Sequence, residues 1–155
     1  MTEKRDAELF ITKYVDILKA NLNEKIDEIN AEKNDGMTLE KVDNNAYYFQ
    51  TFGGKAPAYN PAILFGVTTE IRGTMKGLAD ESLLIATELV VSDKAELDSM
   101  SVMKRIQRYR RALQEVITDN HDKFPNLEME SLPDIPFTIQ RSHYLALGIG
   151  VKITY

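Results

Sequence analysis

Apolar residues recur along the chain with two different periods, which separate predicted helices from predicted strands. Over residues 3–33 the apolar positions are three and four residues apart, as on one face of an α-helix. They are Ala7, Phe10, Tyr14, Ile17, Leu18, Leu22, Ile26 and Ile29. Asn34-Asp35-Gly36 predicts the helix end, because glycine readily adopts a left-handed conformation. We expect this helix to cover a sheet and to project its last turns toward a neighbour. The alternative is a helix that stands away from the sheet.

The stretch 142–155 alternates instead, with apolar residues at every odd position from Leu145 to Tyr155. A period of two over twelve residues predicts a strand over 143–154 with one apolar face. The other face carries Gly148 and Gly150. Glycine weakens a strand, so this pair predicts that another group packs closely there or that the strand bends.

Two more strands are predicted over 62–71 and 82–91, joined into a long hairpin by a glycine-containing connection. The second is apolar on both faces, so we expect it to be central and covered on both sides. Segments 37–42 and 46–51 predict short strands around an Asn44-Asn45 turn.

A second helix is predicted over 101–119, with Asp98 or Ser99 as its N-cap. Its apolar positions are Val102, Ile106, Tyr109, Leu113, Val116 and Ile117. The passage that follows contains Pro133 and Pro136, and it predicts no more than a short strand near 127–132. The elements together predict a single α+β domain over 1–155, with a mostly antiparallel sheet flanked by two helices.

The composition narrows the function classes. The chain has 155 residues, of which 43% are hydrophobic and 28% charged, which is typical of a globular protein. The chain has no cysteine, which excludes disulfides and thiol catalysis. A net charge of −5 argues against a general nucleic-acid binder. No apolar run is long enough to span a membrane, and residues 1–6 lack the apolar core of a signal peptide, so we expect folding in the cytoplasm.

Residues with catalytic potential are few. His121 stands near Asp119 and Asp122 but lacks the second histidine that a typical metal site uses. Glu70 and Glu88 lie in predicted strands and form a paired-carboxylate candidate, although solvent-facing positions explain them more simply. No Gly-x-Ser-x-Gly motif is present. We therefore expect no enzymatic activity, no cofactor and no metal.

The strongest basic run lies in the second predicted helix. Within it, Lys104, Arg108 and Arg111 share a helical face opposite the apolar one. Such a face is either solvated or contacts an acidic partner or passing DNA, because Lys and Arg neutralise phosphates.

Aromatic residues are densest around Gly53-Gly54, from Tyr47 to Tyr59. These rings either pack on the core and the sheet edge or form a contact arm, since Tyr and Phe are enriched at interfaces. We expect two contact segments, residues 50–61 and residues 72–81. The predicted oligomer-interface residues are Phe52, Lys55, Tyr59, Arg72 and Lys76.

The order of these elements resembles a known family. The strand Pro-Ala-Ile-Leu-Phe-Gly-Val is followed by an apolar strand that ends in Val-Val-Ser-Asp. A helix with Arg-Tyr-Arg-Arg-Ala-Leu-Gln-Glu-Val-Ile comes next. With the N-terminal helix and the C-terminal strand, this pattern resembles the tail-terminator and tail-completion proteins of tailed bacteriophages.

The resemblance implies a virion structural protein of the tail or neck, assembled in the host cytoplasm, without enzymatic activity or cofactor. Its implied partners are other copies of itself in a ring that is often six-fold, the tail tube protein, and head-completion or neck proteins. DNA would pass transiently through the ring. The alternative from a different class is a small-ligand-binding module or a minor enzyme with its site near 50–61.

Overall fold

The computed structural model describes residues 6–49, 58–73, 79–92, 99–139 and 142–155. The described elements are, in order, α1 (Ala7–Lys33), β1 (Tyr47–Tyr48), β2 (Ala62–Gly73), β3 (Ala79–Ser92), α2 (Ser99–Asp119), the short 3-10 helix η1 (His121–Lys123), β4 (Leu127–Ile139) and β5 (Ser142–Thr154). The strands form one sheet in the order β1-β2-β3-β5-β4, in which β1 and β2 are parallel and the other neighbours are antiparallel. The predicted α+β fold class is confirmed.

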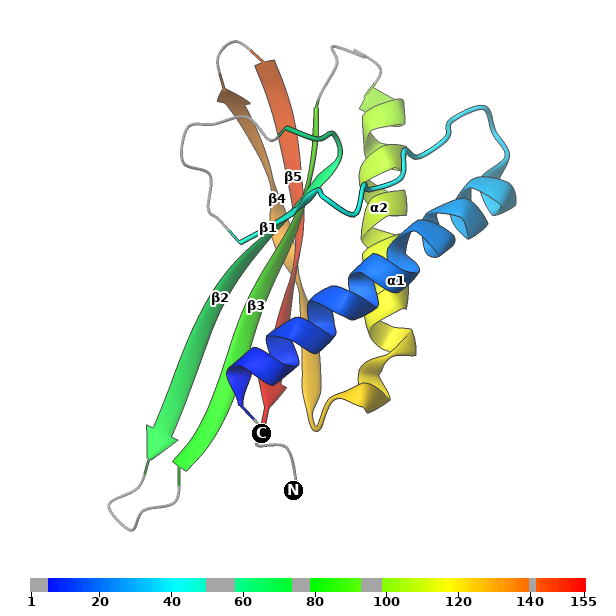
Figure 1. Ribbon diagram of the computed structural model, residues 1–155. Coiled ribbons are helices and arrows are strands. Elements are labelled where there is room, and N and C mark those ends of the chain that lie inside the picture. Colours follow the sequence, from blue (N-terminus) through cyan, green and yellow to red (C-terminus); the bar gives the residue numbers. More distant parts are fainter. Residues whose placement is uncertain (1–5, 50–57, 74–78, 93–98, 140–141) are drawn as a thin grey trace.

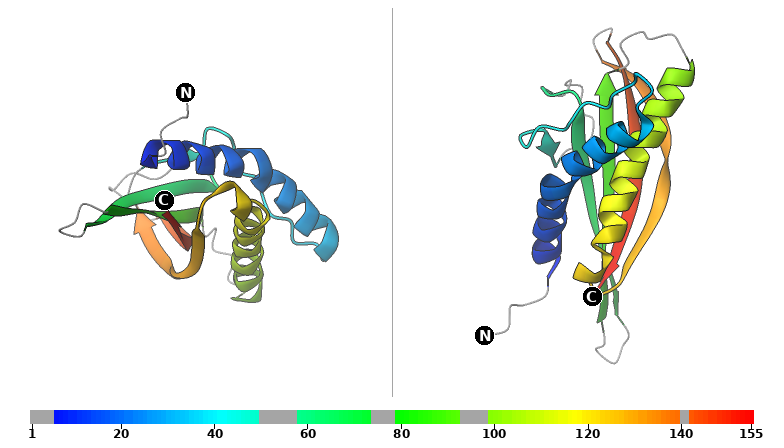
Figure 2. Two further views of the ribbon diagram at one scale, coloured as in Figure 1. Left: turned by 90° about the horizontal axis from the view of Figure 1, so that it is seen from below. Right: turned by 90° about the vertical axis from the view of Figure 1, so that its right-hand side faces the viewer.

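Both helices lie on the same side of the sheet: α1 crosses the strands, and α2 runs beside β5 and β4 (Figures 1 and 2). The predicted stripe of α1 faces the core, where Leu18, Leu22 and Ile26 are fully buried. The alternative of a helix standing away from the sheet is therefore wrong. Near its end α1 packs against α2 and buries Ile26 and Ile29, but residues 31–33 are exposed and the helix extends past α2, so contact with a neighbour stays a prediction (Figure 1). Neither described helix is long and apolar enough to cross a membrane.

Local signals set both ends of α1. The side chain of Asp6 accepts a hydrogen bond from the backbone N–H of Leu9 at 2.9 Å, which satisfies a free donor of the first turn. Asn34 adopts the left-handed conformation at φ 39°, and its N–H bonds the carbonyl of Asn30. The predicted stop is confirmed.

The segment 37–42 is not a strand, contrary to the prediction. The side chains of two asparagines of α1 form hydrogen bonds with its backbone instead. The amide of Asn30 bonds both the N–H and the carbonyl of Leu39, and Asn23 does the same for Val42. Leu39 and Val42 are buried under these bonds. Paired side-chain amides thus replace a sheet ladder and hold the segment along the helix.

The strand β3 is central, as predicted, and pairs with β2 on one side and β5 on the other. Its predicted coverage on both faces holds in part. On the face that the described helices cover, Leu83, Ile85 and Leu89 are buried. On the opposite face Val90 is buried in a small cluster with Leu64 and Ala146, whereas Leu84 and Ala86 keep partial exposure.

The glycine pair of β5 makes room for side chains of β4, which confirms the predicted close packing. A Cβ at Gly148 would lie 3.1 Å from the Cβ of Leu132, and one at Gly150 would lie 3.2 Å from the Cγ of Glu130. The strand β4 runs over thirteen residues, far longer than predicted from its prolines. It tolerates them because it is an edge strand, with a register shift between Leu132 and Ile135.

Candidate interaction surfaces

The structure describes only two of the five predicted interface residues. The other three, Phe52, Lys55 and Lys76, lie outside the described residues. Arg72 is described through its backbone, which pairs with Asp80 near the end of the β2–β3 hairpin. The fifth residue, Tyr59, precedes β2 and is 38% exposed.

The aromatic residues before the first contact segment pack on the start of β2. The ring of Tyr47 stacks on Phe65 at a centroid distance of 6.1 Å, and the ring of Phe49 lies 5.1 Å from the same ring. Packing at the core and sheet edge is therefore confirmed for these two residues. Phe49 nevertheless remains 56% exposed. Tyr59, on the other side of residues 50–57 in the chain, is also exposed, and we call these two aromatic residues the β1-end patch.

A second exposed apolar patch lies on the far half of β2. Val67 is 37% exposed and Ile71 is 67% exposed, although both continue the face that buries Ile63 and Phe65. The hairpin extends past the beginning of α1, so the helix layer does not cover these positions (Figure 1). We call these two residues the hairpin patch. Large apolar side chains left exposed close together indicate a contact surface.

The two edges of the sheet differ sharply. Strand β1 pairs with β2 only at Ile63 and Leu64, so no described strand lies beside β2 from Gly66 to Gly73. The opposite edge, β4, contains Pro133 and Pro136 and a register shift. Prolines and irregular register are devices that keep an edge strand from pairing with other chains. The far half of β2 has none of them.

Of the basic residues on α2, Arg108 does not fit the solvated-face alternative. Arg108 is only 6% exposed, and its guanidinium donates to both carboxylate oxygens of Asp35, at 3.0 and 2.5 Å, and to the carbonyl of Met37. Lys104 also reaches Asp35 at 3.4 Å. The physical reason is the turn after α1, which carries Asp35 over α2. The Arg108 guanidinium holds the pKa of the Asp35 carboxyl well below its ordinary value.

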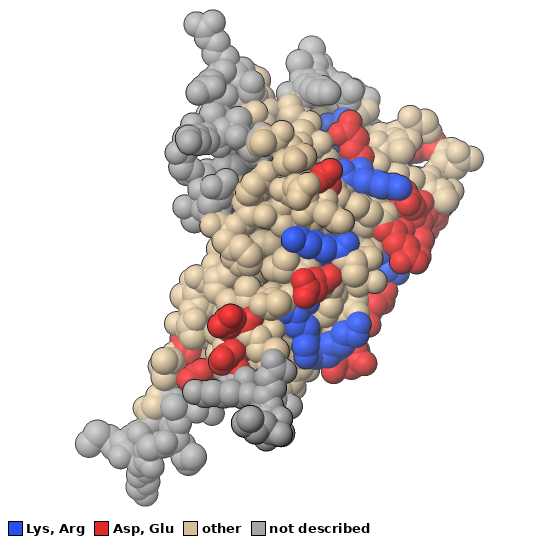
Figure 3. Space-filling view, in the orientation of Figure 1, with Lys and Arg blue, Asp and Glu red and all other residues tan. Residues whose placement is uncertain are grey.

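Arg111 and Arg110 are also in ion pairs. Arg111 contacts Glu32 of α1 at 2.5 Å and Glu115 of its own helix at 2.8 Å. Arg110 pairs with Asp134 of β4 and donates to the carbonyl of Leu132. Figure 3 shows acidic and basic side chains interleaved on the side of the molecule that carries α1. The charges are therefore largely matched within the chain, and contact with a partner or DNA stays a prediction for the partly exposed Lys104 and Arg111.

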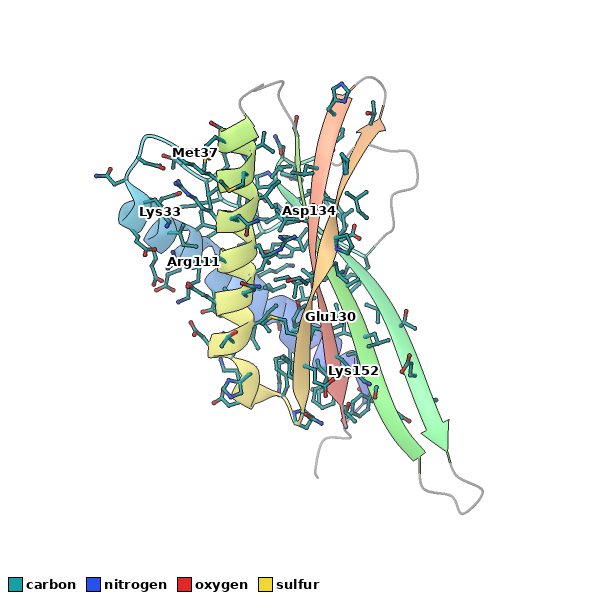
Figure 4. The ribbon with its side chains drawn as sticks, turned by 180° about the vertical axis from the view of Figure 1, so that it is seen from behind. Lys33, Met37, Arg111, Glu130, Asp134 and Lys152 are labelled. Atoms are coloured by element: carbon teal, nitrogen blue, oxygen red, sulfur yellow. The ribbon has the colours of Figure 1, made fainter. Side chains whose placement is uncertain are left out.

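The face of the sheet that carries no described helix holds a hollow of about 290 Å³. Leu84, Leu132, Glu130 and Lys152 are among its lining residues, and Figure 4 shows the last two on adjacent strands. The carboxyl of Glu88 lies on the same face, where burial raises its pKa.

The candidate carboxylate pair is not formed. Glu88 is opposite Leu64 in the β2–β3 ladder, whereas Glu70 is opposite Ser82, six positions along the strands. Six residues of strand separate the two groups by roughly 20 Å. Shared acid–base chemistry between them is excluded.

Most of the site that the ligand-binding alternative predicts, residues 50–57, lies outside the described residues. Near the predicted site, Asn60, Ser92 and Tyr109 are among the residues that line a hollow of about 140 Å³. Pockets for drug-sized ligands usually measure about 300 to 1,000 Å³. The described part of the chain also holds no group of three or more His, Cys, Asp or Glu that could bind a metal.

Sequence reasoning missed the open edge of β2. The run from Val67 to Ile71 is rich in β-branched residues and free of proline, and that signal was present in the sequence. Its position at an edge depends on the shortness of β1, which ends after two residues. Residue type alone does not show which strand will lack a neighbour.

Comparisons with known proteins show little. No protein-family model matches the chain, and no curated protein matches it. Among solved structures, a chain from the virion of a native gene transfer agent particle is a weak neighbour, with a TM-score of 0.38 and 10% sequence identity. The superposition covers 89% of this chain and 95% of that chain. A likeness of this size carries no argument about function.

Proposed function

We propose that the chain is a virion structural protein of a tailed bacteriophage, the tail terminator, without enzymatic activity. In this proposal it forms a homo-oligomeric ring, with six copies as in the family it resembles. The ring caps the tail tube, stops its growth and joins it to head-completion or neck proteins. Its place is the tail or neck of the virion.

The observation that carries the proposal is that exposed apolar residues flank both contact segments. Tyr59 precedes β2 and Ile71 is near its other end, and the nine steps from Ala62 to Ile71 span roughly 30 Å of strand. Phe49 and Val67 are nearer to each other, because Phe49 contacts Phe65, two residues from Val67. Head-to-tail contact requires two different surfaces on each copy, and such contacts close into a ring when the rotation permits.

The proposed contacts follow from charge and apolar content. Phe52 and Tyr59 would be aromatic anchors from residues 50–61, since a few buried aromatic side chains dominate most interfaces. Lys55, Arg72 and Lys76 add positive charge to the contact segments of a chain whose net charge is −5. Basic segments that meet an acidic neighbouring surface favour one register of assembly over others.

The ring is tested by light scattering and electron microscopy of the purified chain and of the variant Phe52→Ala/Tyr59→Ala. We expect the unmodified chain to form rings of uniform mass and the variant to lose them while its melting temperature stays within a few degrees. Each truncation removes about 1–3 kcal/mol of contact energy at a well-buried site.

Ile135→Ala is the matched control, because Ile135 is 51% exposed and lies on β4, away from both patches. It should leave assembly unchanged. Rings that persist in the double variant would remove the aromatic anchors from the proposal, and a chain that is monomeric at every concentration would contradict the ring itself.

A further inference from the structure

The direction of the backbone groups along β2 follows from two hydrogen bonds. The N–H of Ile63 donates to the carbonyl of Ala46 at 2.8 Å, so it points to the outer edge of the sheet. The carbonyl of Glu81, opposite Ile71, accepts from the N–H of Tyr155 on the β5 side. Residues 71 and 81 therefore point away from each other, in a pair without mutual hydrogen bonds.

Because backbone groups alternate along a strand and the β2–β3 register is continuous, the outward set is every second residue. The outward groups of Ile63 and Phe65 make the Tyr48–Leu64 pairing to β1, so the members beyond the β1 contact are Val67, Thr69, Ile71 and Gly73. No described strand pairs with them. Val67, Thr69, Ile71 and Gly73 are solvent-exposed. The edge thus presents a row of donors and acceptors ready for another strand.

One symmetric register suits the free part of this edge. An antiparallel copy centred on Thr69 places Thr69 opposite Thr69, with the outward groups of Val67, Thr69 and Ile71 facing outward groups of the other copy. A register centred on Glu70 would also pair outward residues, but it would place two like charges directly opposite each other.

The side chains fit this pairing as well. Val67 of one copy would be opposite Ile71 of the other, twice, which brings all four residues of the two hairpin patches together. Glu70 would be opposite Thr68, so the two like charges are not directly opposed.

We infer that two copies of this chain associate through antiparallel pairing of their β2 edges about a two-fold axis at Thr69. The paired sheets then form one continuous sheet across the contact. This is a self-complementary contact that joins copies in pairs, and it goes beyond the head-to-tail ring proposed above. Both contacts would bury the hairpin patch, so the patch of one copy takes part in only one of them at a time.

Cysteine cross-linking tests the register directly, because the chain has no cysteine of its own. In a hydrogen-bonded antiparallel pair the opposed Cα atoms are about 5.5 Å apart. That spacing suits a disulfide. Thr69→Cys should therefore give a covalent dimer under mild oxidation. Val67→Cys and Ile71→Cys are matched controls on the same edge, since each would be about 14 Å from its own copy. The double variant Val67→Cys/Ile71→Cys should restore the cross-link.

A second variant removes the pairing without a cross-link. Thr69→Pro deletes an N–H that points outward, so the ladder to β3 loses no bond, and a dimer seen by sedimentation should be lost while the monomer stays folded. Thr68→Pro is the contrast, because its N–H points toward β3 and its loss should destabilise the hairpin.

The outcomes separate the two proposals. Thr69→Cys that cross-links no faster than Val67→Cys overturns the two-fold pairing, whether or not rings form. Selective cross-linking at Thr69 in a protein that forms no ring supports the pairing and contradicts the tail-terminator ring. If Thr69→Pro fails to fold, the cross-linking rates alone decide.

Discussion

The two edge strands of the sheet differ in how well they could pair with a further strand. Strand β4 carries two prolines and a register shift, and Arg110 of α2 ties its bend through Asp134 and the carbonyl of Leu132. The far half of β2 is regular and exposed, with no described strand or helix against it. An edge that is irregular and anchored does not accept a strand, whereas a regular and free edge does.

The two sides also differ in how tightly side chains fill the space over the sheet. On the β4 side, Gly148 and Gly150 lie under Leu132 and Glu130. On the β2 side, a Cβ at Gly66 would find only the Cβ of Ala86, at 3.8 Å. The same residue type therefore has a packing role on one side and no such role on the other.

The largest expected effect comes from exchanging these glycines for alanine. Gly148→Ala places a methyl group 3.1 Å from the Cβ of Leu132, and we expect a loss of about 1–3 kcal/mol in the free energy of unfolding from overpacking. Gly66→Ala should instead be neutral or stabilising by up to about 1 kcal/mol, because alanine costs less entropy in a strand. Urea denaturation measures both. Equal losses for the two variants would contradict the difference between the sides.

A smaller effect is expected from releasing the anchor of β4. Arg110→Met removes the ion pair to Asp134 and the hydrogen bond to the carbonyl of Leu132, at a cost of about 1 kcal/mol. Hydrogen exchange followed by mass spectrometry should show faster exchange over 127–139 and unchanged exchange over 62–73. Protection lost evenly over both strands would mean that Arg110 supports the whole sheet rather than one edge.

The smallest expected effect is on the pH dependence of stability. It involves the ion pair between Asp35 and Arg108 in the helix layer. The Arg108 guanidinium lowers the pKa of Asp35 in the folded chain, so the unfolded chain binds a proton first as pH falls below about 4. Asp35 therefore adds stability above that pH, and the contribution is lost progressively as pH falls toward the folded pKa. The stability of Asp35→Asn should fall less steeply over that range in acid-unfolding experiments. A parallel fall in both proteins would show that this carboxylate is not responsible.

Periodicity alone determined the main elements of this protein. The apolar stripe from Phe10 to Ile29 is buried together only if the segment is a helix with that face toward the core. The alternating apolar residues of β5 are likewise buried together only in a strand. The glycine pair also predicted close packing correctly, since a missing side chain in a strand usually leaves room for a neighbour.

Only the tertiary structure decided the rest, because it depends on what lies beside a segment. The backbone of 37–42 bonds to asparagines of α1 rather than to a strand. Arg108 is buried because the turn after α1 brings Asp35 to it. The β4 strand accepts prolines because nothing described pairs beyond it, and the far half of β2 is open because β1 is short. Residue spacing encodes which face of an element is apolar, but partners distant in sequence determine whether a polar group, an edge or a charge is satisfied.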